Sequence, residues 1–169
     1  QELDELKALL AKKEGVTPDY IHIGAGSGDI LCQTGVAFGL EGGSVMSAFP
    51  TFSLLMNFAE VFKATWHKVN LNDQLEHDYN AMAAAIRSDT RLIFICNPNN
   101  PSGNFMDPQH FEPFAKLGIP LVVDEAYIEY AGLGMSQVEL TKKYKNVFIT
   151  RTLSKAYGLA GMRFGYTIA

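Results

Sequence analysis

Lys155 is the side chain with the clearest chemical potential in this sequence. It follows the apolar run Asn146–Thr150, which is typical of a buried strand, and lies in a stretch rich in Gly, Ala and Ser that runs from Thr150 to Arg163. At a strand end, desolvation or nearby cations destabilise an ammonium group, and the amine can then form a Schiff base with a carbonyl carbon. The alternative is a surface lysine in a turn.

A carboxylate stands in a comparable position. Asp124 directly follows the apolar run Leu121–Val123, so it is expected to be desolvated and to need a cationic partner. A protonated pyridine nitrogen would supply that charge. Together with Lys155, this suggests that the chain binds pyridoxal 5′-phosphate (PLP). The alternative for Asp124 is a structural salt bridge at the edge of the sheet.

The glycine-rich turn Gly24–Asp29 lies between a short strand and the apolar helical run Ile30–Leu40. A strand, a glycine turn and a helix point free N–H groups at an anion, so we expect a phosphate site. The turn is not a dinucleotide fingerprint, because Asp29 stands where a glycine is required, and it is neither a P-loop nor a nucleophile elbow. The alternative is a plain helix entry with Ser27 as the cap.

Two further side chains follow predicted strands. The turn Asn97–Gly103 contains two X-Pro bonds and a glycine, so it is expected to be rigid and to present the Asn100 amide to a ligand. Phe52 lies just past the strand Gly43–Ala48, where open α/β sheets bind ligands. It could stack on a flat ring or simply pack in the core.

The pattern of elements predicts an α/β fold with three α/β/α layers and a mostly parallel, seven-stranded sheet. The crossover rules then place the side chains after the strands along one edge of that sheet. The predicted strands are Tyr20–Ile23, Gly43–Ala48, Thr65–Val69, Arg91–Cys96, Leu121–Val123, Asn146–Thr150 and Arg163–Ile168, and the predicted helices are Leu3–Lys13, Ile30–Leu40, Pro50–Phe62, Tyr79–Ile86, Asp107–Leu117 and Gln137–Tyr144.

The composition is that of one ordinary globular domain. The chain has 169 residues, of which 47% are hydrophobic and 19% charged. The net charge of -4 argues against a general nucleic-acid binder, and no apolar run is long enough to span a bilayer. The acidic N-terminal segment is not a signal peptide. Cys32 and Cys96 are expected to be free thiols in a reducing compartment, a single disulfide being the alternative.

These motifs together resemble the large domain of the fold-type I PLP-dependent aminotransferases of class I/II, and among them the histidinol-phosphate aminotransferases. The most specific part is the combination of Asn-Pro-Asn-Asn-Pro-Ser-Gly, Asp-Glu-Ala-Tyr and Ser-Lys-Ala-Tyr-Gly-Leu-Ala-Gly-Met-Arg. The matching stretches follow the family order over almost the whole chain: Gly24–Leu31, Pro50–Phe52, Asn97–Gly103, Val122–Tyr130 and Thr150–Gly165.

The resemblance implies roles for the residues around the cofactor ring. Lys155 would form the Schiff base with PLP and then act as the general base, and Asp124 would keep the pyridinium nitrogen protonated. Asn100 and Tyr127 would bond the ring O3′. Phe52 would stack on the ring, at a position where many relatives have Tyr.

A second group of residues is implied for the phosphate. Relatives often have Asp or Glu at position 28, so Gly28 keeps the backbone donor but lacks a capping carboxylate. The predicted phosphate ligands are backbone N–H groups of the turn and three side chains: Gly26, Ser27, Gly28, Thr152, Ser154 and Arg163.

The resemblance also implies an activity, the transfer of an amino group between an amino acid and a 2-oxo acid. The amino acid would be histidinol phosphate or an aromatic amino acid, as in histidine biosynthesis, and the enzyme would be a cytoplasmic homodimer without metal, nucleic-acid or membrane partners. Family members carry an N-terminal arm and a C-terminal small domain, both expected to be absent here, which leaves residues 1–169 as a single PLP-binding domain. The alternatives are a PLP-dependent decarboxylase or lyase of the same fold, and a truncated or engineered scaffold without catalysis.

Overall fold

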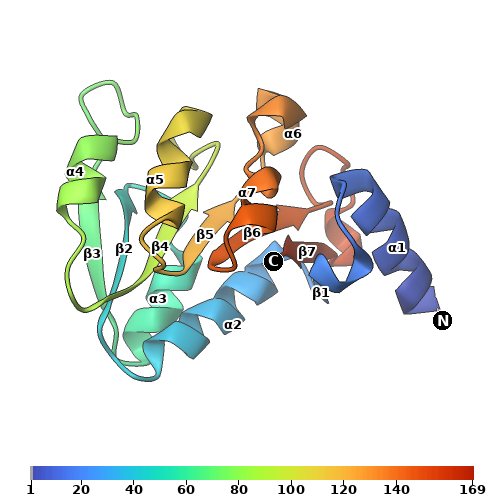
Figure 1. The fold of residues 1–169 in the computed structure, drawn as a ribbon, viewed down its shortest axis with the longest axis horizontal. Coiled ribbons are helices and arrows are strands. Elements are labelled where there is room, and N and C mark those ends of the chain that lie inside the picture. Colours follow the sequence, from blue (N-terminus) through green and yellow to red (C-terminus); the bar gives the residue numbers. More distant parts are fainter. Residues whose placement is uncertain (1) are drawn as a thin grey trace.

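A single seven-stranded sheet forms the centre of the molecule in the computed structural model, which describes residues 2–169 (Figure 1). Its strand order is β1-β7-β6-β5-β4-β2-β3. The strands are β1 (Ile21–Gly24), β2 (Ser44–Phe49), β3 (Thr65–Asn70), β4 (Thr90–Cys96), β5 (Leu121–Asp124), β6 (Val147–Thr152) and β7 (Gly165–Ile168). All seven predicted strands are therefore present, within two residues of their predicted boundaries.

The sheet is parallel except for β7, which runs antiparallel to both of its neighbours, β1 and β6. This confirms the predicted α/β class with a mostly parallel sheet. The carboxyl ends of the six parallel strands meet at one edge. Because β7 is reversed, its amino end lies at that same edge, and so does the segment that precedes it.

Helices cover both faces, which confirms the three-layer arrangement (Figure 1). The α-helices are α1 (Glu2–Glu14), α2 (Ser27–Gly39), α3 (Leu54–Val61), α4 (Tyr79–Ala84), α5 (Phe111–Ala115), α6 (Ile128–Ala131) and α7 (Val138–Lys143). Short 3-10 helices lie at Pro18–Tyr20, Pro108–His110, Leu133–Met135 and Ala160–Met162.

Three helical segments differ from the prediction. Pro50 does not open a helix: α3 begins at Leu54, after the N-cap Ser53. The helix predicted over Asp107–Leu117 is a 3-10 turn followed by the five-residue α5, because Pro113 lies within it and the turn after Asp107 bonds i to i+3. The four-residue α6 was not predicted at all.

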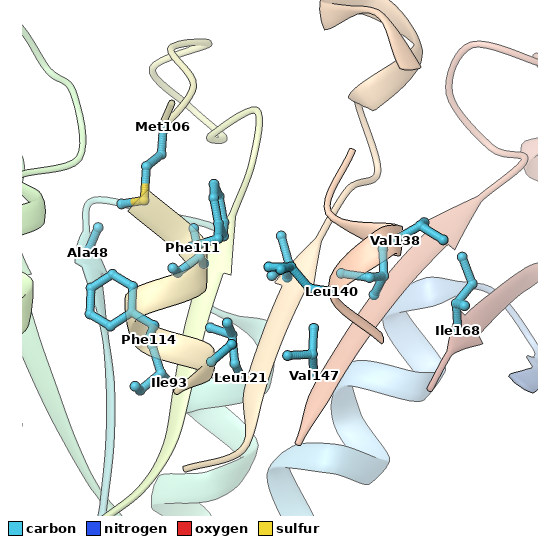
Figure 2. Packing of buried hydrophobic residues seen from close by; sticks show 14 of the residues in the cluster. Ala48, Ile93, Met106, Phe111, Phe114, Leu121, Val138, Leu140, Val147 and Ile168 are labelled. Carbon is cyan, nitrogen blue, oxygen red and sulfur yellow. The ribbon is translucent and has the colours of Figure 1, made fainter. Parts of the chain in front are cut away.

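Successive side chains along the strands point to opposite faces of the sheet and so contribute to two apolar cores. In β4, Ile93 and Ile95 face the cluster beneath α1, α4, α5 and α7, whereas Leu92 and Phe94 face the cluster beneath α2 and α3. Figure 2 shows the first cluster, in which Phe111 and Phe114 of α5 pack onto the sheet. A buried strand with apolar side chains on both faces reads as a continuous apolar run, which is why these strands were predictable.

Helices α2 and α3 cross closely on the second face. A Cβ atom at Gly35 would lie 2.3 Å from the carbonyl oxygen of Leu55, and one at Gly39 would lie 2.7 Å from that of Ala59. Both glycines are thus required by the close approach of the two backbones. The crossing holds the turn before α2 next to the loop before α3. Both segments border the edge of the sheet that carries the carboxyl ends of the parallel strands, where the residues predicted to bind the cofactor lie.

Among residues 2–169, no helix has the length and apolar character needed to cross a membrane. Cys32 is half-buried on α2 and Cys96 is buried at the end of β4, and both are free thiols.

Candidate active site

Asp124, the last residue of β5, is a buried acid with neutral hydrogen-bond partners. Its side chain accepts a hydrogen bond from the Thr150 hydroxyl at 2.9 Å, and the residue is only 2% exposed. Burial raises the pKa of Asp124 from 3.8 to about 6, against the opposing effects of Thr150, the Ala126 N–H and the charge of Lys155. Within residues 2–169 Asp124 forms no ion pair, so the expected alternative of a structural salt bridge does not hold for this residue.

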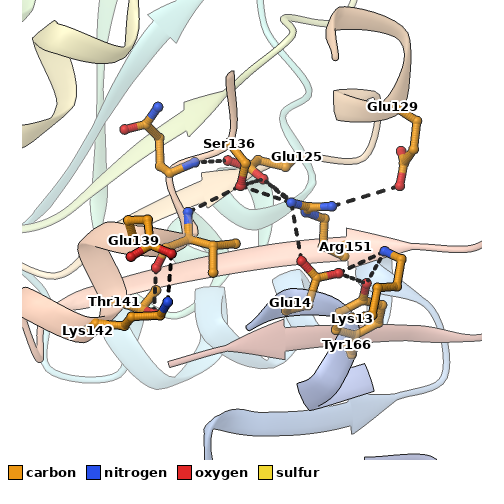
Figure 3. Close-up of polar contacts among 12 residues, drawn as sticks. Lys13, Glu14, Glu125, Glu129, Ser136, Glu139, Thr141, Lys142, Arg151 and Tyr166 are labelled. Atoms are coloured by element: carbon orange, nitrogen blue, oxygen red, sulfur yellow. Dashed lines mark hydrogen bonds and ion pairs between the residues drawn. The ribbon is translucent and has the colours of Figure 1, made fainter. Parts of the chain in front are cut away.

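The salt bridge at this edge belongs instead to the next residue. Glu125 pairs with Arg151 at 2.9 Å, and both side chains are almost fully buried (Figure 3). Alternation along the two strands points this pair to the sheet face opposite Thr150 and Asp124. Arg151 was not singled out in the sequence, where it directly follows the predicted strand Asn146–Thr150 and lies between two threonines.

Lys155 lies three residues beyond the end of β6, in an exposed turn. Its Nζ is 5.2 Å from the centre of the Tyr127 ring, so the two predicted residues lie together. The positive charge of Lys155 also acts on Asp124. A primary amine, a phenol and a buried acid therefore share the carboxyl ends of β5 and β6.

The turn between β1 and α2 has the geometry of an anion site. The N-cap of α2 is Gly26, with φ 98°, and no side chain caps the helix, so the alternative of Ser27 as the cap was wrong. Ser27 and Gly28 instead form the first turn, where N–H groups have no partner within the helix. A β-carbon at Gly26 would lie 2.8 Å from Nη2 of Arg163.

Arg163 reaches this turn because β7 is reversed. Its Nη2 donates to the Ala25 carbonyl at 3.4 Å and its Nη1 to the Ala160 carbonyl at 3.1 Å. Close approach of β7 requires a glycine at position 165, since a β-carbon there would lie 2.2 Å from the backbone nitrogen of Ser27. The guanidinium thus lies beside the helix N-terminus, where two positive groups favour an anion.

Thr152 and Ser154 close the loop after β6. The Thr152 hydroxyl accepts the N–H of Ser154 at 3.1 Å and donates to the Phe164 carbonyl at 3.4 Å. In residues 2–169 neither hydroxyl bonds Arg163, whose hydrogen bonds go to backbone carbonyls. The structure brings these residues to one edge of the sheet without linking them directly.

Phe52 and Asn100 lie on neighbouring loops after β2 and β4. Phe52 is half-buried and packs against the second apolar cluster. The loops are joined by a pair that was not predicted: the Thr51 hydroxyl donates to the Asn99 side-chain oxygen at 2.7 Å. Asn99 is only 3% exposed and also donates to the Ser102 hydroxyl.

A cleft of about 470 Å³ opens beside Asn100 and Tyr127. Its lining is uncharged and largely aromatic or prolyl: Pro98, Asn99, Asn100, Pro101, Gly103, Phe105, Tyr127, Tyr130 and Ala131. Such a cleft leaves space for a small molecule next to the edge that carries Lys155. Nowhere in residues 2–169 do three or more His, Cys, Asp or Glu side chains gather in an arrangement that could hold a metal ion.

Comparison with known proteins places these features in a family context. The sequence model described as aminotransferase class I and II matches residues 1–169. The chain is 44% identical to histidinol-phosphate aminotransferase 1 of Cupriavidus pinatubonensis, covering 98% of this chain and 45% of that protein. It is 40% identical to an aromatic amino acid aminotransferase of Mycolicibacterium vanbaalenii, covering 98% and 48%.

A solved structure is similar over nearly the whole fold. The crystal structure of histidinol-phosphate aminotransferase from Sinorhizobium meliloti in complex with pyridoxal-5′-phosphate gives a TM-score of 0.90 at 31% identity, over 99% of this chain and 47% of that one. The chain thus spans about half the length of the relatives that it matches.

Proposed function

Because the chain belongs to the family of class I and II aminotransferases, we propose that it is the PLP-binding part of an enzyme that moves an amino group between an amino acid and a 2-oxo acid. The proposed amino donor is histidinol phosphate or an aromatic amino acid, as the names of the relatives suggest. The observation that carries the proposal is Asp124, a buried carboxyl group that forms no ion pair in residues 2–169 and is influenced by the charge of Lys155.

Asp124 provides the test of fit for the cofactor. Its hydrogen-bond partners, Thr150 and the Ala126 N–H, are neutral, and the charge of Lys155 offsets only part of the effect of burial. Ionised Asp124 therefore lacks a directly paired countercharge. The pyridinium nitrogen of PLP is a cation that would supply this charge. When bound, PLP supplies an electron sink for negative charge at the α-carbon of the amino acid. In return, the ionised carboxyl group of Asp124 would hold the proton on the ring nitrogen.

The remaining groups of the cofactor would be bound by the loops around Asp124. Phe52 would stack on the ring, and Asn100 and Tyr127 would bond its hydroxyl oxygen. The proposed phosphate ligands are the turn before α2, which has positive φ and free N–H groups, together with two hydroxyls and a guanidinium: Gly26, Ser27, Gly28, Thr152, Ser154 and Arg163.

Lys155 has two proposed tasks. It would hold PLP covalently through Nζ, and it would later use the same nitrogen to take a proton from the α-carbon of the amino acid. Its place supports both tasks, since the Nζ lies over the Tyr127 ring and its charge acts on Asp124.

A cofactor titration with borohydride trapping tests this assignment. We expect PLP to produce a visible absorbance band, and peptide mapping after reduction to find the label at Lys155. Lys155→Ala should abolish both, whereas Lys145→Ala, which removes an exposed lysine just before β6, should abolish neither. A label spread over surface lysines, with an unchanged band in Lys155→Ala, would show that the assignment is wrong.

The type of reaction needs a separate measurement. The PLP-loaded chain is incubated with histidinol phosphate or an aromatic amino acid, and the products are identified by mass spectrometry. Formation of the matching oxo compound supports amino-group transfer. Release of carbon dioxide from the aromatic amino acid would instead indicate a decarboxylase.

We also propose that residues 1–169 form one cofactor-binding domain that works as a cytoplasmic homodimer. Apolar side chains near Lys155 support a covered surface: Tyr157 is 43%, Leu159 39% and Met162 68% exposed. Two free thiols fit a reducing compartment. Light scattering on the eluted protein tests the dimer, and a monomer at all concentrations would contradict it.

A further inference from the structure

Arg151 is the most deeply buried cation among the described residues, with 2% of its surface exposed. It stands one residue before Thr152 in β6, but its side chain points to the opposite face of the sheet. The proposed function gives this residue no task. A buried guanidinium is costly to desolvate, so its partners show what it holds in place.

Its main partner is Glu125, which joins the two ends of the segment from residue 125 to residue 137 (Figure 3). Arg151 donates from Nε to Glu125 Oε2 at 2.9 Å and from Nη2 to the Ser136 hydroxyl at 2.9 Å. Glu125 in turn accepts the Ser136 hydroxyl at 2.9 Å and the Gln137 N–H at 2.7 Å. The two ends of the segment from residue 125 to residue 137 are therefore joined by hydrogen bonds to Glu125, and Arg151 holds both ends through Glu125 and Ser136. We call this set of contacts among Glu125, Ser136, Gln137 and Arg151 the clasp.

The clasped segment carries part of the proposed site. Residues 126–135 include Tyr127 and contribute Tyr130 and Ala131 to the cleft beside Asn100. Much of this segment is exposed, with Tyr130 at 69%. Within the segment, Ala126 and Ile128 are buried and anchor its first part, whereas most of the remainder is exposed. The contacts at the two ends of the segment therefore help to decide where the tyrosines lie.

Helix α1 reaches the same guanidinium from the other side. Glu14 lies 3.6 Å from Nη2 of Arg151 and accepts the Tyr166 hydroxyl at 2.6 Å. Lys13 pairs with Glu14 at 2.8 Å, and Glu129 of α6 lies 3.9 Å from Nη1 of Arg151. One cation thus connects the loop, β6 and α1.

We propose that Arg151 is a positioning residue. It acts through Glu125 to hold the Tyr127 ring beside the loop that carries Lys155. The planar guanidinium binds Glu125 and Ser136 simultaneously, which an ammonium group cannot do with the same geometry. The effect of this positioning on cofactor binding rests on the proposed function, whereas the contacts of the clasp do not depend on it.

Amide hydrogen exchange on the cofactor-free chain tests the clasp. In Arg151→Lys and in Glu125→Gln, exchange over residues 126–135 is expected to rise by roughly tenfold or more, because a charge-assisted hydrogen bond is lost in each. Arg91→Lys is the matched control, since Arg91 forms an exposed pair with Glu41. Exchange at the wild-type rate over residues 126–135 in both clasp variants would overturn the proposal.

A double variant, Arg151→Met with Glu125→Met, separates positioning from stability. An apolar pair of similar volume often restores stability where a buried ion pair is removed, but it cannot bond Ser136 or the Gln137 N–H. We expect this variant to have the wild-type free energy of unfolding but fast amide exchange over residues 126–135. Once PLP is added, we expect the pKa at which the absorbance band titrates to differ from that of the wild type. Wild-type exchange and an undisplaced band would overturn the proposal. Absence of the band in the wild-type chain would count against the proposed function, while the exchange data would still decide the clasp.

Discussion

Replacing Asp124 by asparagine should stabilise the cofactor-free chain, and should do so more at neutral than at acid pH. Burial raises the pKa of this carboxyl group to about 6, compared with 3.8 in an exposed setting. One pKa unit corresponds to about 1.4 kcal/mol, so ionised Asp124 is disfavoured in the folded chain by about 3 kcal/mol. The ionisation that the proposed function requires therefore destabilises the empty fold.

The direction of the pH dependence follows from the two pKa values. The contribution of protonated Asp124 is fully present below pH 3.8 and is lost as pH rises through about 6. Relative to a neutral side chain, Asp124 lowers the free energy of unfolding by about 1 kcal/mol at about pH 4.5 and by about 3 kcal/mol at about pH 7.5. Asparagine keeps an oxygen that can accept the Thr150 hydroxyl, and the cost of its buried amide is the same at both pH values.

Urea unfolding of the cofactor-free wild type and Asp124→Asn at these two pH values measures the effect. We expect the variant to gain about 2 kcal/mol more, relative to wild type, at the higher pH than at the lower. Glu41→Gln, which removes an exposed carboxylate, corrects for the change in net charge. An equal difference between Asp124→Asn and wild type at both pH values would refute the reasoning, because Asp124 would then have partners that compensate its charge.

Three further outcomes are expected. Gly165→Ala should lower the free energy of unfolding by about 3 kcal/mol and weaken phosphate binding, because its β-carbon would meet the backbone of the turn before α2, whereas Gly161→Ala has open space and should change neither quantity. Thr51→Val should cost about 1 kcal/mol in urea unfolding, since it removes the 2.7 Å hydrogen bond between the loops after β2 and β4. A thiol reagent should label Cys32 in the native chain but reach Cys96, which is 1% exposed, only after denaturation. Loss of stability in Gly161→Ala, none in Thr51→Val, or rapid native labelling at Cys96 would contradict the respective expectation.

The central strands were predictable because they contain apolar runs bounded by turn residues. Leu121–Val123 and Asn146–Thr150 are examples, and both match their strands within two residues. The direction of β7 could not be predicted, since a strand pattern reads the same in both directions. For that reason the strand pattern alone could not place Arg163 beside Gly26, which only the family resemblance had implied.

The loop after β4 shows why site residues are harder to assign than strands. Asn97, Asn99 and Asn100 are chemically identical and nearly adjacent. In the fold, Asn97 accepts the Met106 N–H and Asn99 bonds Thr51, whereas Asn99 and Asn100 both line the cleft. The rigid turn predicted that Asn100 is presented to a ligand, but only the backbone path shows that Asn97 and Asn99 bond other parts of the fold.

Asp124 and Glu125 make the same point for charge. They are adjacent acids, 2% and 0% exposed, at the end of one strand. Because successive side chains point to opposite faces of the sheet, Glu125 accepts a hydrogen bond from Arg151 on one face, whereas Asp124 accepts one from the Thr150 hydroxyl on the other. A charge with an internal partner belongs to the scaffold, because its pairing is complete within the fold. A positive ligand stabilises the ionised form of a buried acid whose hydrogen-bond donors are neutral. This difference between neighbours, more than burial itself, is the reason that we propose Asp124 as the partner of the cofactor.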